Sequence, residues 1–75
     1  MAERQYSTAD FVRERRRASQ MTQHALASLA GVRQDKISEI ERGKPSLRMD
    51  TVNRVLAVFG CRLGPVPAER HEDEP

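Results

Sequence analysis

Apolar residues recur at helical spacing along this chain, and the clearest stretch runs from Met49 to Phe59. Within it Val52, Val55, Leu56 and Phe59 follow the i, i+3, i+4, i+7 pattern that places side chains on one face of a helix. The glycine that follows is the residue type that commonly ends a helix. The pattern therefore predicts an amphipathic helix over this segment.

A shorter helix is predicted over the Ala-rich segment after Thr22, a residue type that caps helix N-termini. We expect Leu26, Leu29 and Ala30 to face the core, and Gly31 to end the helix.

Another helix is predicted from Gln34 to Glu41, where Ile37 and Ile40 stand three positions apart. The residues from 44 to 49 are expected to form a loop.

The first helix is predicted from about Thr8 to Ser19, with Ser7 as a candidate N-cap and Asp10 as a favourable charge in the first turn. Its apolar residues are Phe11, Val12 and Ala18.

Beyond residue 60, the alternation from Cys61 to Val66 predicts a short strand, which a Gly-Pro pair limits in length. A lone strand in a helical domain needs a partner, and its copy in a second subunit is the obvious one.

Composition adds bounds to this picture. The 75 residues suffice for one small domain, and Cys61 is the only cysteine, so no intrachain disulfide can form. Cys61 is expected to be a small buried hydrophobe, with a redox-sensing thiol or an intersubunit disulfide as alternatives. The sequence has neither a membrane-length apolar run nor the apolar segment of a signal peptide, which predicts a cytoplasmic protein without membrane contact.

Charge is distributed unevenly along the chain. The net charge is +2, but residues 68–75 hold four acidic residues against one arginine, which leaves +5 on residues 1–67. A basic body suits a polyanionic partner, although ordinary surface charge for solubility would look the same.

Two short helices joined by the tight turn at Gly31 and Val32 predict a helix-turn-helix over residues 22–42. The second helix of such a unit can enter the major groove of DNA, with its outward side chains at the base edges.

We place a flexible N-terminus at residues 1–7, the DNA-binding domain at 8–66 with its strand at 61–66, and an acidic disordered tail at 67–75. The tail could serve a protein partner or only solubility.

The candidate contacts follow from this placement. Gln34 is the best base reader, because an amide can bond both N6 and N7 of adenine. Asp35 could accept a bond from cytosine or be only a favourable first-turn charge, and the flanking cations could be a solvated surface. The candidate base contacts are Gln34, Asp35, Lys36 and Glu39. The candidate phosphate contacts are Thr22, Gln23, Arg33, Ser38, Arg42, Lys44 and Arg16. The candidate dimer contacts are Val58, Cys61, Leu63 and Val66.

Two stretches carry a family resemblance, MTQHALASLAGV at residues 21–32 and ISEIERG at 37–43. They resemble the phage-repressor/Cro-type helix-turn-helix family, also called the XRE family. The resemblance implies an all-α fold, a compact four-to-five-helix bundle of the lambda-repressor-like type that acts as a homodimer on two-fold symmetric double-stranded operator DNA. It also implies a partly buried brace between Arg16 and Glu41, with Arg16 near a phosphate, and a phosphate clamp at Gln23.

This sequence departs from the family pattern at three points. Arg33 replaces the usual Ser or Thr cap, Arg15 stands where an apolar residue is common, and the usual fifth helix is replaced by the predicted strand. The strand is similar to that of the small antitoxin branch, whose members repress their own operon and bind a kinase-fold toxin. An antitoxin-type repressor is therefore the favoured hypothesis, and a stand-alone phage- or plasmid-type regulator is the alternative.

Other classes of function find little support in the sequence. The two histidines, His24 and His71, are not spaced for catalysis or metal binding, so we expect no catalytic residue, no metal and no cofactor. Single-strand RNA binding would need more aromatic residues than the three present.

Overall fold

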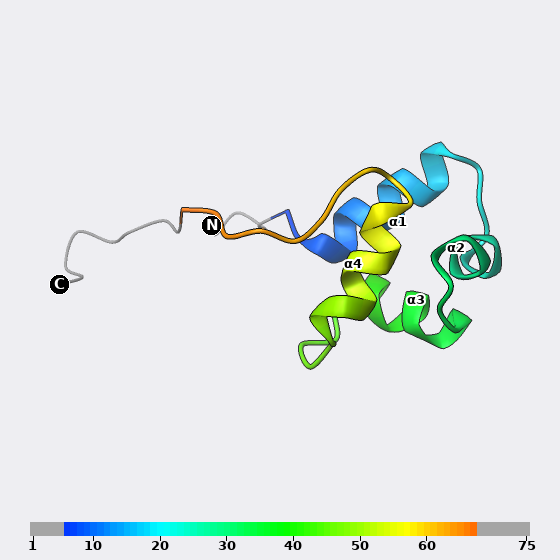
Figure 1. Cartoon of the computed structure of the whole chain (residues 1–75). Helices are drawn as coiled ribbons and strands as arrows, with labels where there is room; N and C mark the ends of the chain where they lie inside the picture. Colours follow the sequence, from blue (N-terminus) through cyan, green and yellow to red (C-terminus); the bar gives the residue numbers. More distant parts are fainter. Residues whose placement is uncertain (1–5, 68–75) are drawn as a thin grey trace, which may run out of the picture.

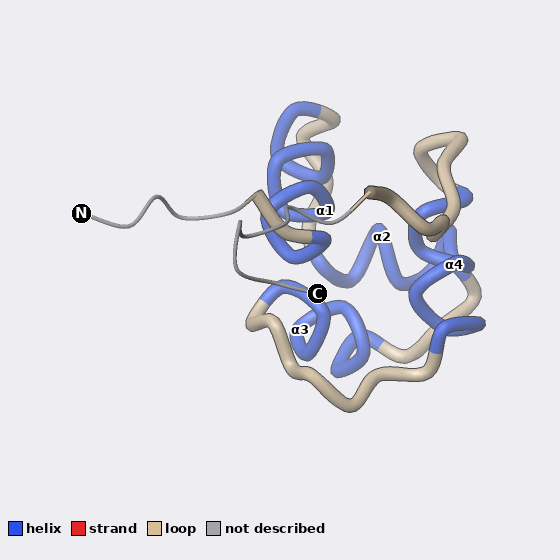
Figure 2. The backbone as a smooth tube through the Cα atoms, turned by 90° about the vertical axis from the view of Figure 1, so that its left-hand side faces the viewer, coloured by secondary structure: helices blue, strands red, loops and turns tan. Residues whose placement is uncertain are grey.

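The computed structural model describes residues 6–67, which form four helices and no strand. The helices are α1 (Thr8–Ala18), α2 (Gln23–Ala30), α3 (Gln34–Glu41) and α4 (Met49–Ala57). In Figure 1, α3 lies below α1 and α4, and it packs against all three other helices. Figure 2 shows the loop between α3 and α4 running around the outside of the bundle.

The prediction of an all-α helix-turn-helix bundle is confirmed. Residues 68–75 of the tail expected at 67–75, and residues 1–5 of the expected flexible N-terminus, lie outside the described residues.

Two of the four helices begin with a side-chain cap. Ser7 accepts the N–H of Asp10 at 3.2 Å while the Asp10 carboxylate accepts the N–H of Ser7 at 3.0 Å, which is a complete capping box. Thr22 accepts the N–H of Ala25 at 3.0 Å, as the sequence predicted. The N-cap residues of α3 and α4, Arg33 and Arg48, make no such bond.

All four described helices end in the same way, with the two backbone bonds of a Schellman motif. The N–H groups just past each helix bond back to carbonyls three and five residues earlier, as Gly43 does to Ile40 and Lys44 does to Glu39. The turn needs a residue with positive φ. Glycine supplies it after α2, α3 and α4, and Gln20 supplies it after α1 with φ of 57°.

The core lies where the four helices meet and is built from aliphatic side chains. Its buried members are Val12, Leu26, Ala27, Ile37, Ile40, Val52, Val55 and Leu56. Phe11 and Phe59 close one edge, with their rings edge to face and their centroids 6.4 Å apart. The predicted stripes of α3 and α4 are therefore the ones that are buried.

One prediction about packing is wrong. Leu29, expected to face the core, is 65% exposed, because α2 turns the stripe of Leu26, Ala27 and Ala30 inward instead. Within the single chain, residues 61–67 form no strand, and the N–H of Leu63 donates to the Asn53 side chain on α4 at 2.6 Å. The strand expected over 61–66 would pair with its copy in a second subunit, so it stays a prediction. The first and last helices also end one and two residues earlier than predicted.

Candidate DNA interface

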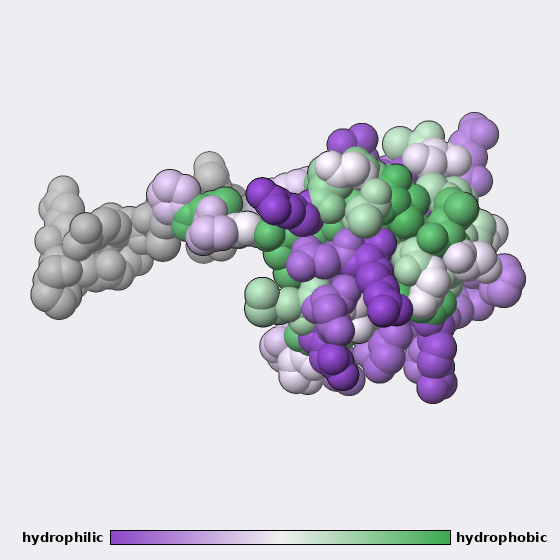
Figure 3. Space-filling view, viewed as in Figure 1, coloured by the Kyte–Doolittle hydropathy of each residue, from purple (hydrophilic) through white to green (hydrophobic). Residues whose placement is uncertain are grey.

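The unit α2–turn–α3 presents one face of α3 to solvent. Ile37 and Ile40 are buried, so the helix is fixed in rotation about its own axis. Gln34 and Asp35, at its N-terminal end, are exposed, while Lys36, Ser38 and Glu39 are half-buried. Hydrophilic side chains cover most of the lower half of the face in Figure 3, where α3, the loop after it and the start of α4 lie in Figure 1. The predicted base-contact residues therefore share one end and one side of α3.

Behind this face lies an ion pair that joins α1 to α3. Arg16 donates from Nε to Oε2 of Glu41 at 2.7 Å and from Nη2 to Oε1 at 3.1 Å, which is the bidentate geometry of a strong pair. Its Nη1 donates to the carbonyl of Met21 at 2.9 Å. The two side chains are only 13% and 6% exposed. We call Arg16, Glu41 and their partner Gln23 the brace.

The brace stabilises the charged form of Glu41. Burial alone would raise its pKa, but the hydrogen bonds from Arg16 and Gln23, together with the charges of Arg16 and Arg13, outweigh burial, so the pKa lies below the ordinary value. The hydrogen bond to Glu41 also raises the pKa of Arg16, so both groups are ionised at neutral pH.

Gln23 has a role in the brace that the sequence did not reveal. Its Nε2 donates to Oε1 of Glu41 at 3.2 Å. A side-chain amide has two N–H groups, so a second one remains for another acceptor. Arg13 was also missed, and its Nη2 lies 3.4 Å from both the Glu41 carbonyl and Oδ1 of Asp10. The i, i+3 spacing of Asp10 and Arg13 was a signal that could have indicated the latter contact.

A second charged group lies on the outer side of α3. Oε1 of Glu39 is 3.5 Å from Nζ of Lys36, and Oε2 is 3.7 Å from Nζ of Lys44. We call these three residues the outer cluster. The structure thus brings together a predicted base contact and a predicted phosphate contact through one carboxylate.

The remaining candidates vary in how free their side chains are. Arg33 is exposed and pairs with Asp35 at 3.3 Å, and Arg42 is exposed at the end of α3. The hydroxyl of Thr22 already accepts a bond as the α2 cap. Arg16 uses three of its five N–H groups inside the protein.

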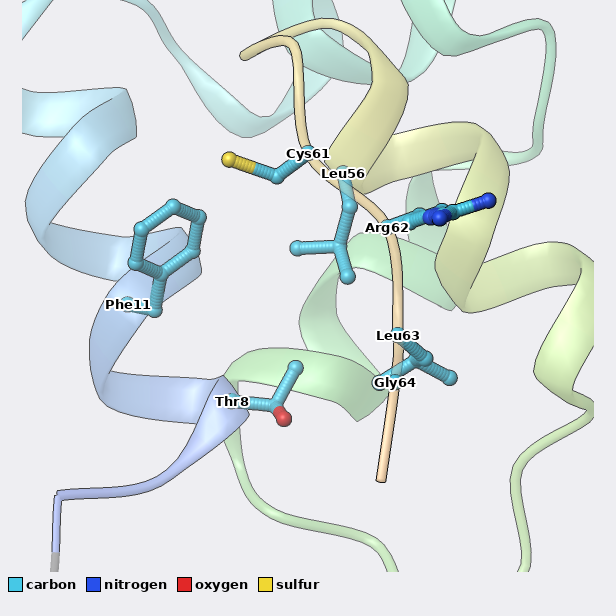
Figure 4. A pocket seen from close by; sticks show the side chains of 7 residues that line it. All are labelled: Thr8, Phe11, Leu56, Cys61, Arg62, Leu63 and Gly64. Carbon is cyan, nitrogen blue, oxygen red and sulfur yellow. The ribbon is translucent and has the colours of Figure 1, made fainter. Parts of the chain in front are cut away.

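The segment after α4 packs on its own domain. Figure 4 shows Cys61 pointing toward Phe11 of α1, while the side chains of Arg62 and Leu63 extend to the other side of the segment. These residues line a pocket of about 300 Å³. Cys61 is half-buried against the core, and its Sγ lies 3.5 Å from the Phe59 carbonyl.

Two observations bear on other classes of protein. In residues 6–67, no helix is both long and apolar enough to cross the membrane. The same residues hold no group of three or more His, Cys, Asp or Glu side chains that could bind a metal ion.

The arrangement of a short helix, a tight turn and a second helix with an exposed polar face is that of a helix-turn-helix protein. A family model described as a helix-turn-helix domain matches residues 9–70, most of the chain. The protein belongs to this family, as an XRE-like helix-turn-helix domain. Membership indicates a DNA-binding regulator and is typical of proteins that are not enzymes. A search among curated proteins finds no significant match.

Proposed function

We propose that this protein is a sequence-specific regulator of transcription that binds double-stranded DNA with α3 in the major groove and represses by occupying its operator. The observation that carries the proposal is the construction of α3. One side is anchored by Ile37, Ile40 and the brace, while Gln34 and Asp35 are exposed at the N-terminal end. A rigidly held helix with a free polar end is what base recognition requires.

Base contacts are assigned to the exposed end of α3. Gln34 can bond adenine through both groups of its amide, and Lys36 can donate to guanine or to a phosphate. Asp35 carries a carboxylate, which can only accept hydrogen bonds, so cytosine N4 is the base group it suits. The Glu39 carboxylate would suit the same group, but it is half-buried and lies beyond the exposed end of α3.

Phosphate contacts are assigned to the rim of the same unit. The second N–H of the Gln23 amide and the first backbone N–H groups of α2 lie at a helix N-terminus, which favours an anion. Arg33, Arg42 and Lys44 flank α3, and Ser38 adds a hydroxyl. Arg16, mostly committed to the brace, would contribute through its remaining N–H groups.

A homodimer would match a two-fold operator, since each subunit then reads one half-site. We assign its interface to Val58, Cys61, Leu63 and Val66. Val66 is 80% exposed, which supports this assignment. Cys61 and Leu63 instead pack partly against the core of their own subunit. In a dimer they would therefore position the interface, with only part of each side chain left to contact the second subunit.

Within the family, the proposal includes an antitoxin role, with a kinase-fold toxin as the second partner. The sequence from Ile37 to Pro45 supports this role by its similarity to the antitoxin branch. The alternative is a stand-alone phage- or plasmid-type regulator, which would need no strand at residues 61–67; within the single chain these residues form none. A kinase-like reading frame beside the gene, whose product co-purifies with this protein, would support the antitoxin role.

The test of DNA reading begins with selection of bound duplexes from a random pool, followed by titration of the selected site. Gln34→Ala should reduce discrimination at one base pair by about 1–3 kcal/mol while other positions keep theirs. Ser28→Ala, a truncation on the exposed side of α2, serves as the control and should change nothing. Equal weakening on all sequences would show that Gln34 touches only the DNA backbone.

A further inference from the structure

An acidic side chain stands among the cations on the outer side of α3. The Glu39 carboxylate lies between the ammonium groups of Lys36 and Lys44, at 3.5 and 3.7 Å. The Glu39 side chain is 17% exposed, against 41% and 44% for the two lysines. The carboxylate therefore lies deeper in the surface than the cations it pairs with.

The backbone at the end of α3 fixes this arrangement. The N–H of Lys44 donates to the carbonyl of Glu39 at 3.1 Å, and Gly43 makes the turn with φ of 77°. A Schellman turn commonly brings a hydrophobic contact between these two positions. Here it brings opposite charges together instead. Lys36 reaches the same carboxylate from one turn earlier on the helix.

The contacts in this outer cluster are loose. Both exceed the roughly 2.7–2.9 Å of a strong charge-assisted bond, and the buried Oε1 atom of Glu39 accepts no hydrogen bond. A buried acceptor without a bond is unfavourable, so the arrangement is poorly explained by stability alone. Both lysines could exchange the carboxylate for a phosphate without loss of a strong bond.

We propose that Glu39 acts as a brake on binding to DNA of any sequence. It neutralises part of the charge of Lys36 and Lys44 and places a negative group near the phosphates, so that binding depends more on base contacts. Lower affinity for all sequences raises the relative weight of the specific contacts. This inference rests on the proposed function, because it assumes that α3 faces DNA.

The experiment compares wild type with Glu39→Gln, using a mixed-sequence DNA duplex and a series of salt concentrations. Each lysine freed to contact a phosphate should raise affinity about 5–10-fold near 0.1 M salt and steepen the log–log salt slope by about 0.9. Glu14→Gln is the matched control. It removes the same charge from the exposed side of α1, where Glu14 accepts a bond from Tyr6 at 3.1 Å, and should leave the slope unchanged.

A second arm asks whether the gain needs the lysines. In a Lys36→Gln, Lys44→Gln background, Glu39→Gln should lose most of its gain in affinity, because only the removal of a negative charge near the phosphates then remains. If Glu39→Gln does not fold by circular dichroism, Glu39→Ala is measured in its place with the same expectation. Unchanged affinity and slope would overturn the proposal. So would loss of preference at one base pair with unchanged affinity for the mixed duplex, since that assigns Glu39 to base reading. A wild type that binds neither mixed nor selected duplexes contradicts the DNA-binding function itself.

Discussion

Glu41 and Glu39 lie two residues apart on α3, and their surroundings differ in almost every respect. Glu41 accepts three side-chain hydrogen bonds between 2.7 and 3.2 Å, from Arg16 and Gln23. Glu39 has two longer ion pairs and one buried oxygen without a hydrogen bond. The partners of Glu41 belong to α1 and α2, while those of Glu39 belong to α3 itself and the loop after it.

The difference separates two functions of one short helix. The inner glutamate holds α3 in place against two neighbouring helices, with geometry that leaves little freedom. The outer glutamate pairs with two lysine side chains that are 41% and 44% exposed, at distances that cost little to change. A DNA-reading helix needs both properties, a fixed axis and side chains that can exchange partners.

The largest expected effect comes from breaking the inner pair. Glu41→Ala leaves the Arg16 guanidinium largely buried without its carboxylate, which should lower the free energy of unfolding by about 3–5 kcal/mol. Glu39→Ala, the matched change on the outer side, should stay within about 1 kcal/mol. Urea unfolding followed by circular dichroism measures both. Equal losses at the two positions would contradict the comparison.

The double variant Arg16→Met, Glu41→Leu sharpens the same point. Replacing both charges by apolar groups of similar size should be nearly neutral, since no buried charge then lacks a partner. A large loss in the double variant would mean that Arg16 and Glu41 stabilise the domain through contacts other than their mutual pair.

The acid response should distinguish the brace from exposed pairs. Because the pKa of Glu41 is lowered in the folded chain, the unfolded chain binds its proton more readily. The stabilisation from Glu41 is therefore full above the ordinary glutamate pKa of about 4.3 and is lost as pH falls through the lower folded value. Unfolding at neutral and acidic pH should show this loss in wild type and a smaller one in Glu41→Gln.

Asp50 is the control for that measurement. Its pKa is also lowered, chiefly by the hydrogen bond from Arg48, but the pair is exposed at the start of α4. Asp50→Asn should leave the acid dependence almost as in wild type, because exposed pairs are screened by solvent. An acid response that depended on Asp50 more than on Glu41 would reverse the ranking.

A smaller effect is expected at Arg33, where stability and DNA binding should move in opposite directions. Arg33 is the N-cap residue of α3 and makes no cap bond. Arg33→Ser should raise the free energy of unfolding by about 1 kcal/mol by supplying the cap. It should also reduce the log–log salt slope of DNA binding by about 0.9, through loss of one phosphate contact.

Arg48→Ser is the matched variant, because Arg48 is likewise an N-cap residue without a cap bond. It should change stability in the same direction and leave the salt slope unaltered. If both variants reduced the slope equally, Arg33 would have no special place on the DNA-facing side.

Much of the fold could be predicted from the sequence because its signals are local. Thr22 and Gly31 mark the ends of α2, and the two isoleucines mark the buried side of α3, so both helices were placed correctly. The Arg16–Glu41 pair followed from the family pattern, and its two-bond geometry confirms it.

What could not be predicted depends on tertiary packing. Leu29 and Ala30 are adjacent apolar residues in a short helix, and only the position of α2 against α3 and α4 decides that Leu29 stays outside. The second role of Gln23, as a donor to Glu41, needs the approach of α2 to the end of α3. The outer cluster depends on the turn at Gly43, which brings Lys44 back beside Glu39, five positions earlier in the chain.

The Schellman turns that close all four described helices have a kinetic consequence. Each turn is complete within six residues, so the signal that ends each helix is local in the sequence. Domains dominated by such local contacts fold within about microseconds to milliseconds. A newly made chain should therefore reach its folded form soon after release, long before slower routes such as aggregation can compete.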